Sequence, residues 1–428
     1  MRGIIEGFYG EPWSQEARLA VIDFAGRHGF DTYVYAPKDE PKHRKRWREL
    51  YDDEELARFR ELGQAAATAG VRLVYSVNPG LDMRFSDWDD FHALSGKVEQ
   101  MRSAGFDGAM LAFDDIDPTL KEDDARRFGG QPGAAQAYLA NWLYREQRTL
   151  KEPFQLLFMP TENHGMRPSV YVAALAEQLN RDIEVMWTGP DLRSAKINGA
   201  QAREFAAMVG RPPVLWDNYP VNDFRPTRLF LGPVVGRGAD LPRAVRGVLV
   251  NAMSQARASF VPLATYAAYL GNPAKYDPEA ALRAAVAEVG GDAADALDQL
   301  VEFQRESHIA PRRQTAARLL EWMSMAARAT DRSGGPAVEH VETELRGLEI
   351  LPDALAGAAA PGLADEVAAW SGKLAKAADV AHTALTGKDR SGLAEQIAAL
   401  RADKTEIGEP LLDFAESLVR AQAVPAGR

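Results

Sequence analysis

The sequence predicts an α/β protein in which a closed (β/α)8 TIM barrel is followed by an all-α helical bundle. Short apolar runs alternate with longer amphipathic segments up to about residue 275, which is the βαβα pattern of a parallel sheet. Eight such runs are present, and a barrel of this kind typically takes about 250 residues. Beyond about Pro273 the chain becomes rich in Ala, Leu, Glu and Arg and has helical periodicity. We therefore expect a barrel domain at residues 1–275 and a helical domain at 276–428.

Each expected strand is a short apolar run that helices on both faces of a parallel sheet would bury. The eight strands are expected at Gly3 to Phe8, Thr32 to Ala36, Val71 to Val77, Gly108 to Phe113, Phe154 to Met159, Ile183 to Trp187, Pro213 to Trp216 and Val248 to Asn251. Amphipathic segments between them predict helices at Ser14 to His28, with Ser14 as the cap, Glu54 to Ala69, Trp88 to Ala104, Ala134 to Leu150 and Val170 to Leu179.

In the C-terminal part, successive antiparallel helices are expected at Glu302 to Glu306, Ala316 to Ala327, Val338 to Leu348, Glu366 to His382 and Leu393 to Arg401. Glycine-rich breaks at 332–336 and 357–362 separate them. Trp322 and Trp370 lie in helical apolar patterns, so we expect both in the core of this bundle.

Composition narrows the classes of function. Hydrophobic residues make up 46% of the 428 residues and charged residues 26%, and no apolar run reaches the ~18 residues of a membrane span. The net charge of −11 argues against a nucleic-acid partner, and the basic run 42–46 is expected as a solvated loop or substrate rim. Cysteine is absent, and the N-terminus shows no signal pattern. A cytoplasmic location is expected, with a mature form restarted at Met as the alternative.

The expected fourth strand ends in two adjacent carboxylates, Asp114 and Asp115. Parallel α/β folds bind ligands at the C-terminal ends of their strands. Neighbouring residues that leave a strand point to different sides, so the two carboxylates would sample different surroundings and could hold different pKa values. One could stay charged while the other carries a proton. The plainer interpretation is that one aspartate caps the following helix and the other coordinates solvent or a cation.

Other chemistries find weaker support. The pattern Gly7-x-x-Gly10 lacks the third glycine of a dinucleotide loop, and no phosphate-binding loop is present. The seven histidines are scattered singly, which disfavours a transition-metal site. Asp114, Asp115 and Asp117 could bind Mg²⁺, but only Glu162 could join them from the next strand ends. We expect no cofactor and no metal.

Several strand ends together resemble glycoside hydrolase family 84, the β-N-acetylglucosaminidases that include the O-GlcNAcases. The matching motifs are Arg2-Gly-Ile-Ile-Glu-Gly-Phe-Tyr-Gly-Glu-Pro-Trp13, Tyr35-Ala-Pro-Lys-Asp39, Phe113-Asp-Asp-Ile116, Pro160-Thr-Glu162, Trp187-Thr-Gly-Pro190 and Trp216-Asp-Asn218 with Asn222-Asp223. The resemblance covers the whole expected barrel, and the helical domain is a weaker match to the bundle that follows the family's barrel.

The resemblance implies a retaining exo-glycosidase in which the 2-acetamido oxygen of the substrate attacks the anomeric carbon and forms an oxazoline. Asp114 would hold the acetamido N–H, and Asp115 would protonate the leaving oxygen and later deprotonate water. By the same resemblance, the sugar hydroxyls and acetamide would be held by Gly7, through its backbone, Lys38, Asn218, Asp223 and Asn251. Trp216 would wall the N-acetyl pocket.

One residue departs from the family pattern. Family members usually have Tyr after Pro-Thr-Glu, where this chain has Asn163, so the acyl preference is open. The implied substrate is a β-GlcNAc glycoside or glycoprotein. A modified protein, a cell-wall fragment and a free glycoside all remain candidates for the natural substrate. Selectivity between GlcNAc and GalNAc is also open. A non-catalytic sugar-binding barrel and a metal-dependent barrel lyase or aldolase are the competing functions, and a homodimer is one alternative for the oligomeric state.

Overall fold

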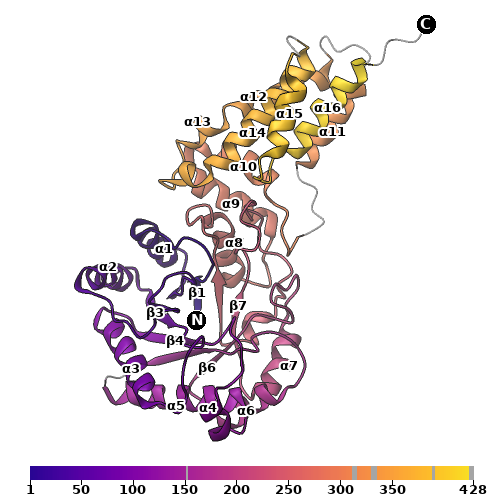
Figure 1. Ribbon diagram of the computed structural model, residues 1–428. Helices are drawn as coiled ribbons and strands as arrows, with labels where there is room; N and C mark the ends of the chain where they lie inside the picture. Colours follow the sequence, from indigo (N-terminus) through magenta and orange to yellow (C-terminus); the bar gives the residue numbers. More distant parts are fainter. Residues whose placement is uncertain (151–152, 311–315, 329–334, 388–390, 424–428) are drawn as a thin grey trace. The chain divides into compact units, whose positions relative to one another are not determined.

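The computed structural model describes residues 1–150, 153–310, 316–328, 335–387 and 391–423, and their strands form the predicted closed barrel (Figure 1). The eight strands pair in parallel and in sequence order, and β1 also pairs with β8, with Arg2 opposite Val248. Their bounds are β1 Arg2–Glu6, β2 Thr32–Tyr35, β3 Arg72–Val77, β4 Gly108–Ala112, β5 Gln155–Met159, β6 Glu184–Trp187, β7 Val214–Asp217 and β8 Gly247–Asn251. All eight predicted strands are thus confirmed, with ends that move by one or two residues.

Helices connect the strands and surround the barrel. The five predicted ones are confirmed, and the Ser14 side chain caps α1 by accepting from the Ala17 N–H. Helices α4, α7 and α8 and the short η1 were not among the predicted ones. The helices up to the end of the barrel are α1 Gln15–Arg27, α2 Asp53–Ala69, α3 Trp88–Ser103, α4 Glu122–Arg127, α5 Pro132–Leu150, α6 Val170–Gln178, α7 Gly199–Val209, η1 Leu241–Arg243 and α8 Phe260–Gly271.

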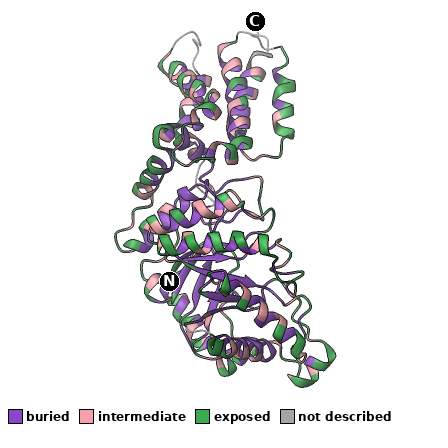
Figure 2. Ribbon diagram, turned by 90° about the vertical axis from the view of Figure 1, so that its left-hand side faces the viewer, coloured by how far each residue is buried: buried purple, intermediate pink, exposed green. Residues whose placement is uncertain are grey.

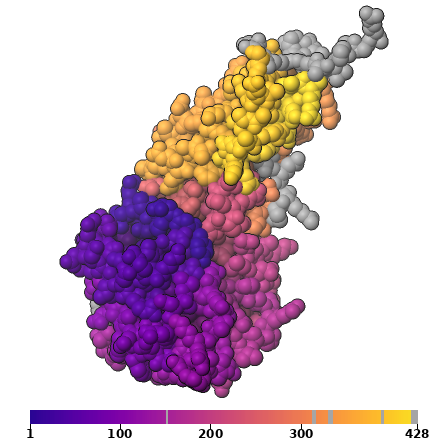
Figure 3. All heavy atoms as spheres, viewed as in Figure 1, coloured from indigo at the N-terminus to yellow at the C-terminus, as the bar shows by residue number. Residues whose placement is uncertain are grey.

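Apolar side chains from every strand fill the barrel interior, as expected for a packed barrel. Figure 2 shows the strands almost entirely in the colour of buried residues. Figure 3 shows the outer surface of the barrel segments, which run from indigo to magenta. The interior cluster consists of Ile5, Val34, Ala36, Val74, Met110, Ala112, Leu157, Met159, Met186, Val214, Trp216 and Leu249. Because this interior is close-packed, polar strand-end residues are held above it by a rigid support.

Contacts divide the chain into two compact units, each described here by itself. One contains Met1–Asp223, Val234–Ala256 and Leu263–Asp277, and the other contains Phe224–Pro233, Arg257–Pro262 and Pro278–Arg428. The second unit is helical, with α14 packed against α12, α13, α15 and α16. Its helices are α9 Pro278–Gly290, η2 Gly291–Ala293, α10 Ala294–Phe303, α11 Ala317–Arg328, α12 Pro336–Glu349, α13 Leu351–Leu355, α14 Leu363–Thr386, α15 Leu393–Ala402 and α16 Glu409–Ala423.

Two predictions for the helical unit were wrong. The helix expected at Glu302 to Glu306 is the end of α10, which stops at Phe303 because the buried Gln304 side chain binds the Leu229 N–H and the Glu406 carbonyl, at 2.9 Å each. Trp322 is only partly buried. Trp370 is buried as predicted, and its indole N–H donates to the Thr227 carbonyl. The expected break at 332–336 falls largely outside the described residues, and the break at 357–362 separates α13 from α14. Among the described residues, no helix is long and apolar enough to cross a membrane.

Candidate active site

Strand β4 delivers two neighbouring carboxylates to the C-terminal end of the barrel. The strand stops at Ala112, and Phe113 continues its buried face before the chain turns at Asp114 and Asp115. Asp114 is 5% exposed, whereas Asp115 is exposed and has a left-handed φ of 54°. The expectation that the two adjacent residues meet different surroundings is therefore confirmed.

Asp114 is surrounded by donors from the two preceding strands. Lys38, which follows β2, forms a buried ion pair with Oδ2 of Asp114. Asn78, which follows β3, donates its side-chain amide to Oδ1 and to the backbone oxygen of Asp114, at 3.2 Å each. Opposite charge and amide donation both stabilise a carboxylate in a buried position.

Asp115 receives one hydrogen bond from a side chain that follows β1. The Tyr9 hydroxyl donates to Oδ2 of Asp115 at 2.8 Å, and the guanidinium of Arg44 donates to the same hydroxyl at 2.8 Å. Burial and the Asp115 carboxylate raise the pKa of Tyr9 above its ordinary value of 10.0. Tyr9 therefore keeps its proton and acts as a donor to Asp115.

A chain of amide contacts links the ends of β1, β7 and β8. The Gly7 N–H donates to Oδ1 of Asn251 at 3.1 Å, and Nδ2 of Asn251 donates to Oδ1 of Asn218 at 3.1 Å. The indole N–H of Trp216 donates to the same Asn218 oxygen at 2.7 Å. The Lys38 ammonium lies 5.7 Å from the centre of the Trp216 ring, so this chain reaches Asp114 through a cation–π contact.

The two remaining predicted site residues differ in their connections. Oδ2 of Asp223 accepts the Tyr9 N–H at 2.9 Å, which joins Asp223 to the surroundings of Asp115. Asn163 is buried, but its Oδ1 lies 3.0 Å from Nδ1 of His164 and its backbone oxygen accepts the Thr188 N–H at 2.7 Å. The structure thus links Asp114, Asp115, Gly7, Lys38, Trp216, Asn218, Asp223 and Asn251, while Asn163 contacts His164 and Thr188 instead.

Some polar strand ends belong to the barrel wall. Glu6 is fully buried, and its carboxylate accepts from Nε and Nη2 of Arg18 at 2.9 Å each and from the Trp13 N–H at 3.0 Å. Asp217 forms a bidentate ion pair with Arg237, in which Nε and Nη2 each lie 2.6 Å from a carboxylate oxygen. These two carboxylates are therefore committed to fixing loops.

The sequence predicted a solvated loop or substrate rim for the basic run 42–46, and the solvated loop is wrong for His43 and Arg44, which are buried. His43 is fully buried with Nδ1 2.8 Å from the Ser76 carbonyl, and burial lowers the pKa of His43 to about 3. Arg44 is 8% exposed, and Lys42 pairs with Glu55 at 2.6 Å. Only Lys45 and Arg46 are exposed. The sequence alone does not reveal this burial, because it depends on partners from β3, α2 and the loop after β1, and the substrate rim stays a prediction.

Sequence reasoning therefore missed three residues that touch the carboxylate pair: Tyr9, Arg44 and Asn78. Asn78 directly follows β3 and Tyr9 lies in the loop after β1, so their positions near strand ends were a usable signal. Arg44 gave no such signal, because it lies in the segment between β2 and α2.

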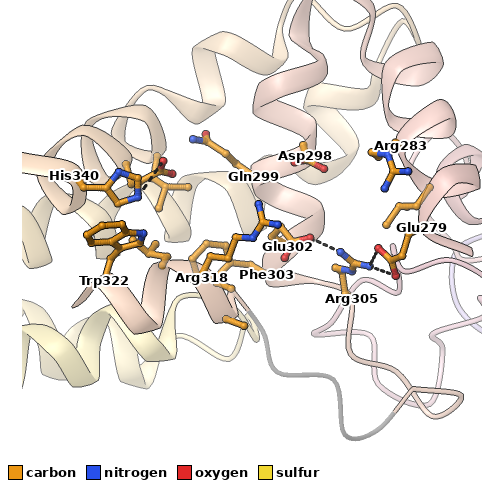
Figure 4. A pocket seen from close by; sticks show the side chains of 16 residues that line it. Glu279, Arg283, Asp298, Gln299, Glu302, Phe303, Arg305, Arg318, Trp322 and His340 are labelled. Carbon is orange, nitrogen blue, oxygen red and sulfur yellow. Dashed lines mark hydrogen bonds and ion pairs between the residues drawn. The ribbon is translucent and has the colours of Figure 1, made fainter. Parts of the chain in front are cut away.

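A cavity of about 840 Å³ lies in the helical unit, and Figure 4 shows its lining. Arg305 there pairs with Glu279 and Glu302, and the ring of Trp322 lies 4.5 Å from that of His340. Trp322 lines this cavity, contrary to the prediction that it belongs to the core. Because Arg305 neutralises two of its carboxylates, the cavity is a poorer candidate for acid–base chemistry than the strand-end pair.

Within the described ranges, no group of three or more His, Asp or Glu residues is arranged to hold a metal ion. The carboxylate pair is instead contacted by Lys38, Asn78 and Tyr9.

The fold is a closed parallel barrel with two neighbouring carboxylates at the C-terminal end of β4, the end at which barrel enzymes place their active sites. Residues 2–304 match the family model described as beta-N-acetylglucosaminidase, and the chain belongs to this family, glycoside hydrolase family 84. It is 37% identical over 273 residues to the protein O-GlcNAcase of Rattus norvegicus and to that of Mus musculus. These matches cover 62% of this chain but only 29% of either relative.

A solved structure is similar over almost the whole chain. An Asp-to-Asn mutant of the Thermobaculum terrenum O-GlcNAc hydrolase aligns with a TM-score of 0.83 and 26% identity, covering 98% of this chain and 94% of that one. The similarity includes the helical unit, which the family model covers only up to residue 304.

Proposed function

We propose that this protein is a retaining exo-β-N-acetylglucosaminidase that removes terminal β-linked GlcNAc by substrate-assisted catalysis. The observation that carries the proposal is the contrast between two adjacent carboxylates: Asp114 is buried and ion-paired with Lys38, and Asp115 is exposed and hydrogen-bonded by Tyr9. A buried carboxylate that donors hold in place suits charge stabilisation, and an exposed one suits proton exchange with the leaving group and water.

In the first step the acetamido oxygen attacks the anomeric carbon, and the bond from that carbon to the leaving oxygen breaks. Asp114 accepts the acetamido N–H and stabilises positive charge as the oxazoline ring closes, while Asp115 gives its proton to the leaving oxygen. In the second step Asp115, now a carboxylate, takes a proton from water as that water attacks the anomeric carbon. The ring opens with net retention of configuration.

The amide chain of Gly7, Asn251 and Asn218 supports binding of the sugar. Oδ1 of Asn218 already accepts from Trp216 and from Asn251, and Nδ2 of Asn218 donates one of its two hydrogens to the Leu192 carbonyl at 2.9 Å. One N–H of Asn218 is therefore left for a sugar oxygen. Trp216 is 3% exposed and rigidly held, which suits a wall for the acetamide methyl.

The proposed substrates include GlcNAc attached to Ser or Thr of proteins, because the rat and mouse relatives are protein O-GlcNAcases. A cell-wall fragment and a free glycoside carry the same terminal sugar and are tested in the same way. We propose no nucleic-acid or membrane partner, since the net charge of −11 opposes both phosphate-rich surfaces.

The test compares 4-methylumbelliferyl glycosides of GlcNAc, GalNAc and glucose, with and without EDTA. We expect hydrolysis of the GlcNAc compound, none of the glucose compound, which lacks the acetamide, and no effect of EDTA. The variant Asp117→Asn should show the same pattern as the wild type. Asp117 is an exposed carboxylate two residues beyond Asp115, and it accepts the Thr119 N–H at 2.9 Å. Turnover of the glucose compound, or activity that EDTA removes and Mg²⁺ restores, would contradict the proposal and favour a metal-dependent barrel enzyme.

A further inference from the structure

We propose that Arg44 is a positioning residue for Asp115, acting through the Tyr9 hydroxyl and the Asp115 backbone. The inference rests on the role proposed above for Asp115 as general acid and base. Arg44 lies in the basic segment between β2 and α2, and its side chain is buried. Its Nη1 donates to the Tyr9 hydroxyl at 2.8 Å and its Nη2 donates to the Asp115 carbonyl at 2.7 Å. One planar group thus joins the loops that follow β1 and β4.

The guanidinium fixes the direction of the proton on Tyr9. Arginine can only donate, so the Tyr9 oxygen must accept from Nη1 and must direct its own hydrogen elsewhere. The available acceptor is Oδ2 of Asp115 at 2.8 Å. With Arg44 in place, the hydrogen bond from Tyr9 to Oδ2 is specified by the geometry of three side chains.

The same guanidinium supports the backbone of Asp115. A φ of 54° is uncommon for a residue other than glycine and persists where surrounding contacts hold it. The charge-assisted bond from Arg44 to the Asp115 carbonyl is such a contact. It fixes the backbone conformation from which the Asp115 side chain projects.

These contacts leave one oxygen of Asp115 for chemistry. Tyr9 occupies Oδ2, and Oδ1 has no hydrogen-bond partner among the described residues. We therefore place the exchanged proton on Oδ1, which must face the leaving oxygen within hydrogen-bond reach. Loss of Arg44 would let Tyr9 and Asp115 rotate and would misplace this proton.

The loop of Tyr9 has supports that do not depend on Arg44. Asp223 accepts the Tyr9 N–H and Asp39 accepts the Gly10 N–H, each at 2.9 Å. Removing the guanidinium should therefore disturb the hydroxyl of Tyr9 more than the path of its backbone. This separation makes the proposal testable by kinetics.

The experiment measures kcat/KM of Arg44→Met and Tyr9→Phe for two β-GlcNAc glycosides, one with methanol and one with 2,4-dinitrophenol as leaving group. Since general acid catalysis supplies about 10²–10⁴-fold in rate, we expect about a 10- to 100-fold loss with the methyl glycoside. The dinitrophenyl glycoside leaves without protonation and should lose much less. Arg46→Met is the matched control, because Arg46 is exposed on the same segment and pairs only with Glu49 at 3.1 Å among the described residues.

A double variant separates positioning from general damage. In an Asp115→Ala background the acid is gone, so adding Arg44→Met should cause no further loss with the methyl glycoside. A further loss there, or equal losses of both substrates in the single variant, would overturn the proposal. If Arg44→Met does not fold, Tyr9→Phe decides, since it deletes only a hydroxyl. A wild-type protein inactive on both glycosides would instead contradict the proposed function itself.

Discussion

The side-chain amide of Asn78 contacts Asp114 twice, with Nδ2 at 3.2 Å from Oδ1 and at 3.2 Å from the backbone oxygen. This places a neutral donor beside the ion pair of Asp114 with Lys38. Both donors hold the carboxylate in one orientation, which is what a group that must align an acetamide requires.

We predict that Asn78→Ala lowers kcat by about tenfold, less than the 10²–10³ typical when a sole preorganised donor is removed, because Lys38 remains. Steady-state kinetics on the 4-methylumbelliferyl substrate measures this. Asn141→Ala is the control, since the side chain of Asn141 also makes two hydrogen bonds, to the Gln178 carbonyl and from the Asn180 N–H, outside the site. It should lower Tm without changing kcat. Unchanged kcat in Asn78→Ala would show that Asp114 needs no amide support.

The barrel could be predicted from sequence because its signal is local. Each strand is a short apolar run, and Asp114 and Asp115 directly follow one of them, so position along the chain was enough to place them at the mouth. The burial of Arg44 and the double contact of Asn78 could not be predicted in this way. They depend on contacts between residues 36 to 71 positions apart, which form only when the strands that carry them assemble into one sheet.

The helical unit shows the same limit. Helix α14 was predicted from its own periodicity, whereas the end of α10 is set by Gln304, whose partners Leu229 and Glu406 lie 75 and 102 residues away. A sequence window cannot contain such partners.

Gly7 is constrained by the wall of the proposed N-acetyl pocket. A Cβ at this position would lie 2.5 Å from Cζ2 of Trp216, whose ring is buried in the barrel interior and cannot retreat. We predict that Gly7→Ala shifts the wall and raises KM for the GlcNAc substrate by about tenfold or more, because a pocket change of one methyl-sized group alters binding by about 1–3 kcal/mol.

Gly96→Ala serves as the control for this variant. Gly96 lies inside α3, and a Cβ there would meet nothing within 4 Å. It should leave KM unchanged and stabilise the protein by about 0.5–1 kcal/mol through its helix propensity. An unaltered KM in Gly7→Ala would mean that Trp216 does not line the pocket.

Asn163 should govern acyl preference if it lines the pocket as the family motif implies. Its backbone is fixed by the bond from Thr188, so a replacement side chain would start from the same position. We predict that Asn163→Tyr sharpens preference for N-acetyl over N-butanoyl substrates by about 1–3 kcal/mol, the range of one or a few methylenes in a pocket. Ratios of kcat/KM across an N-acyl series measure it, and identical ratios in both proteins would remove Asn163 from the pocket.

His43 makes a pH-dependent contribution to stability. Burial lowers its pKa from 6.5 to about 3, so below pH 6.5 the unfolded chain binds a proton that the folded protein excludes. The contribution is therefore full above pH 6.5 and is lost as the pH falls toward 3. We predict that Tm of His43→Gln falls less steeply than Tm of the wild type between pH 6.5 and pH 4.5. Equal slopes of Tm against pH in the two proteins would contradict the lowered pKa of His43.

A leaving-group series separates the proposed role of Asp114, which orients the acetamide, from that of Asp115, which protonates the leaving oxygen. For wild type, Asp114→Ala and Asp115→Ala, kcat/KM is measured on aryl β-GlcNAc glycosides whose phenols span a wide range of acidity. Asp115→Ala should depend more steeply on leaving-group acidity than wild type, because it cannot protonate a poor leaving group. Asp114→Ala should slow every substrate by a similar factor, roughly 10²–10³, because it acts on the acetamide. A steeper dependence for Asp114→Ala would reverse the two roles, and near wild-type rates in both variants would place the catalytic pair elsewhere.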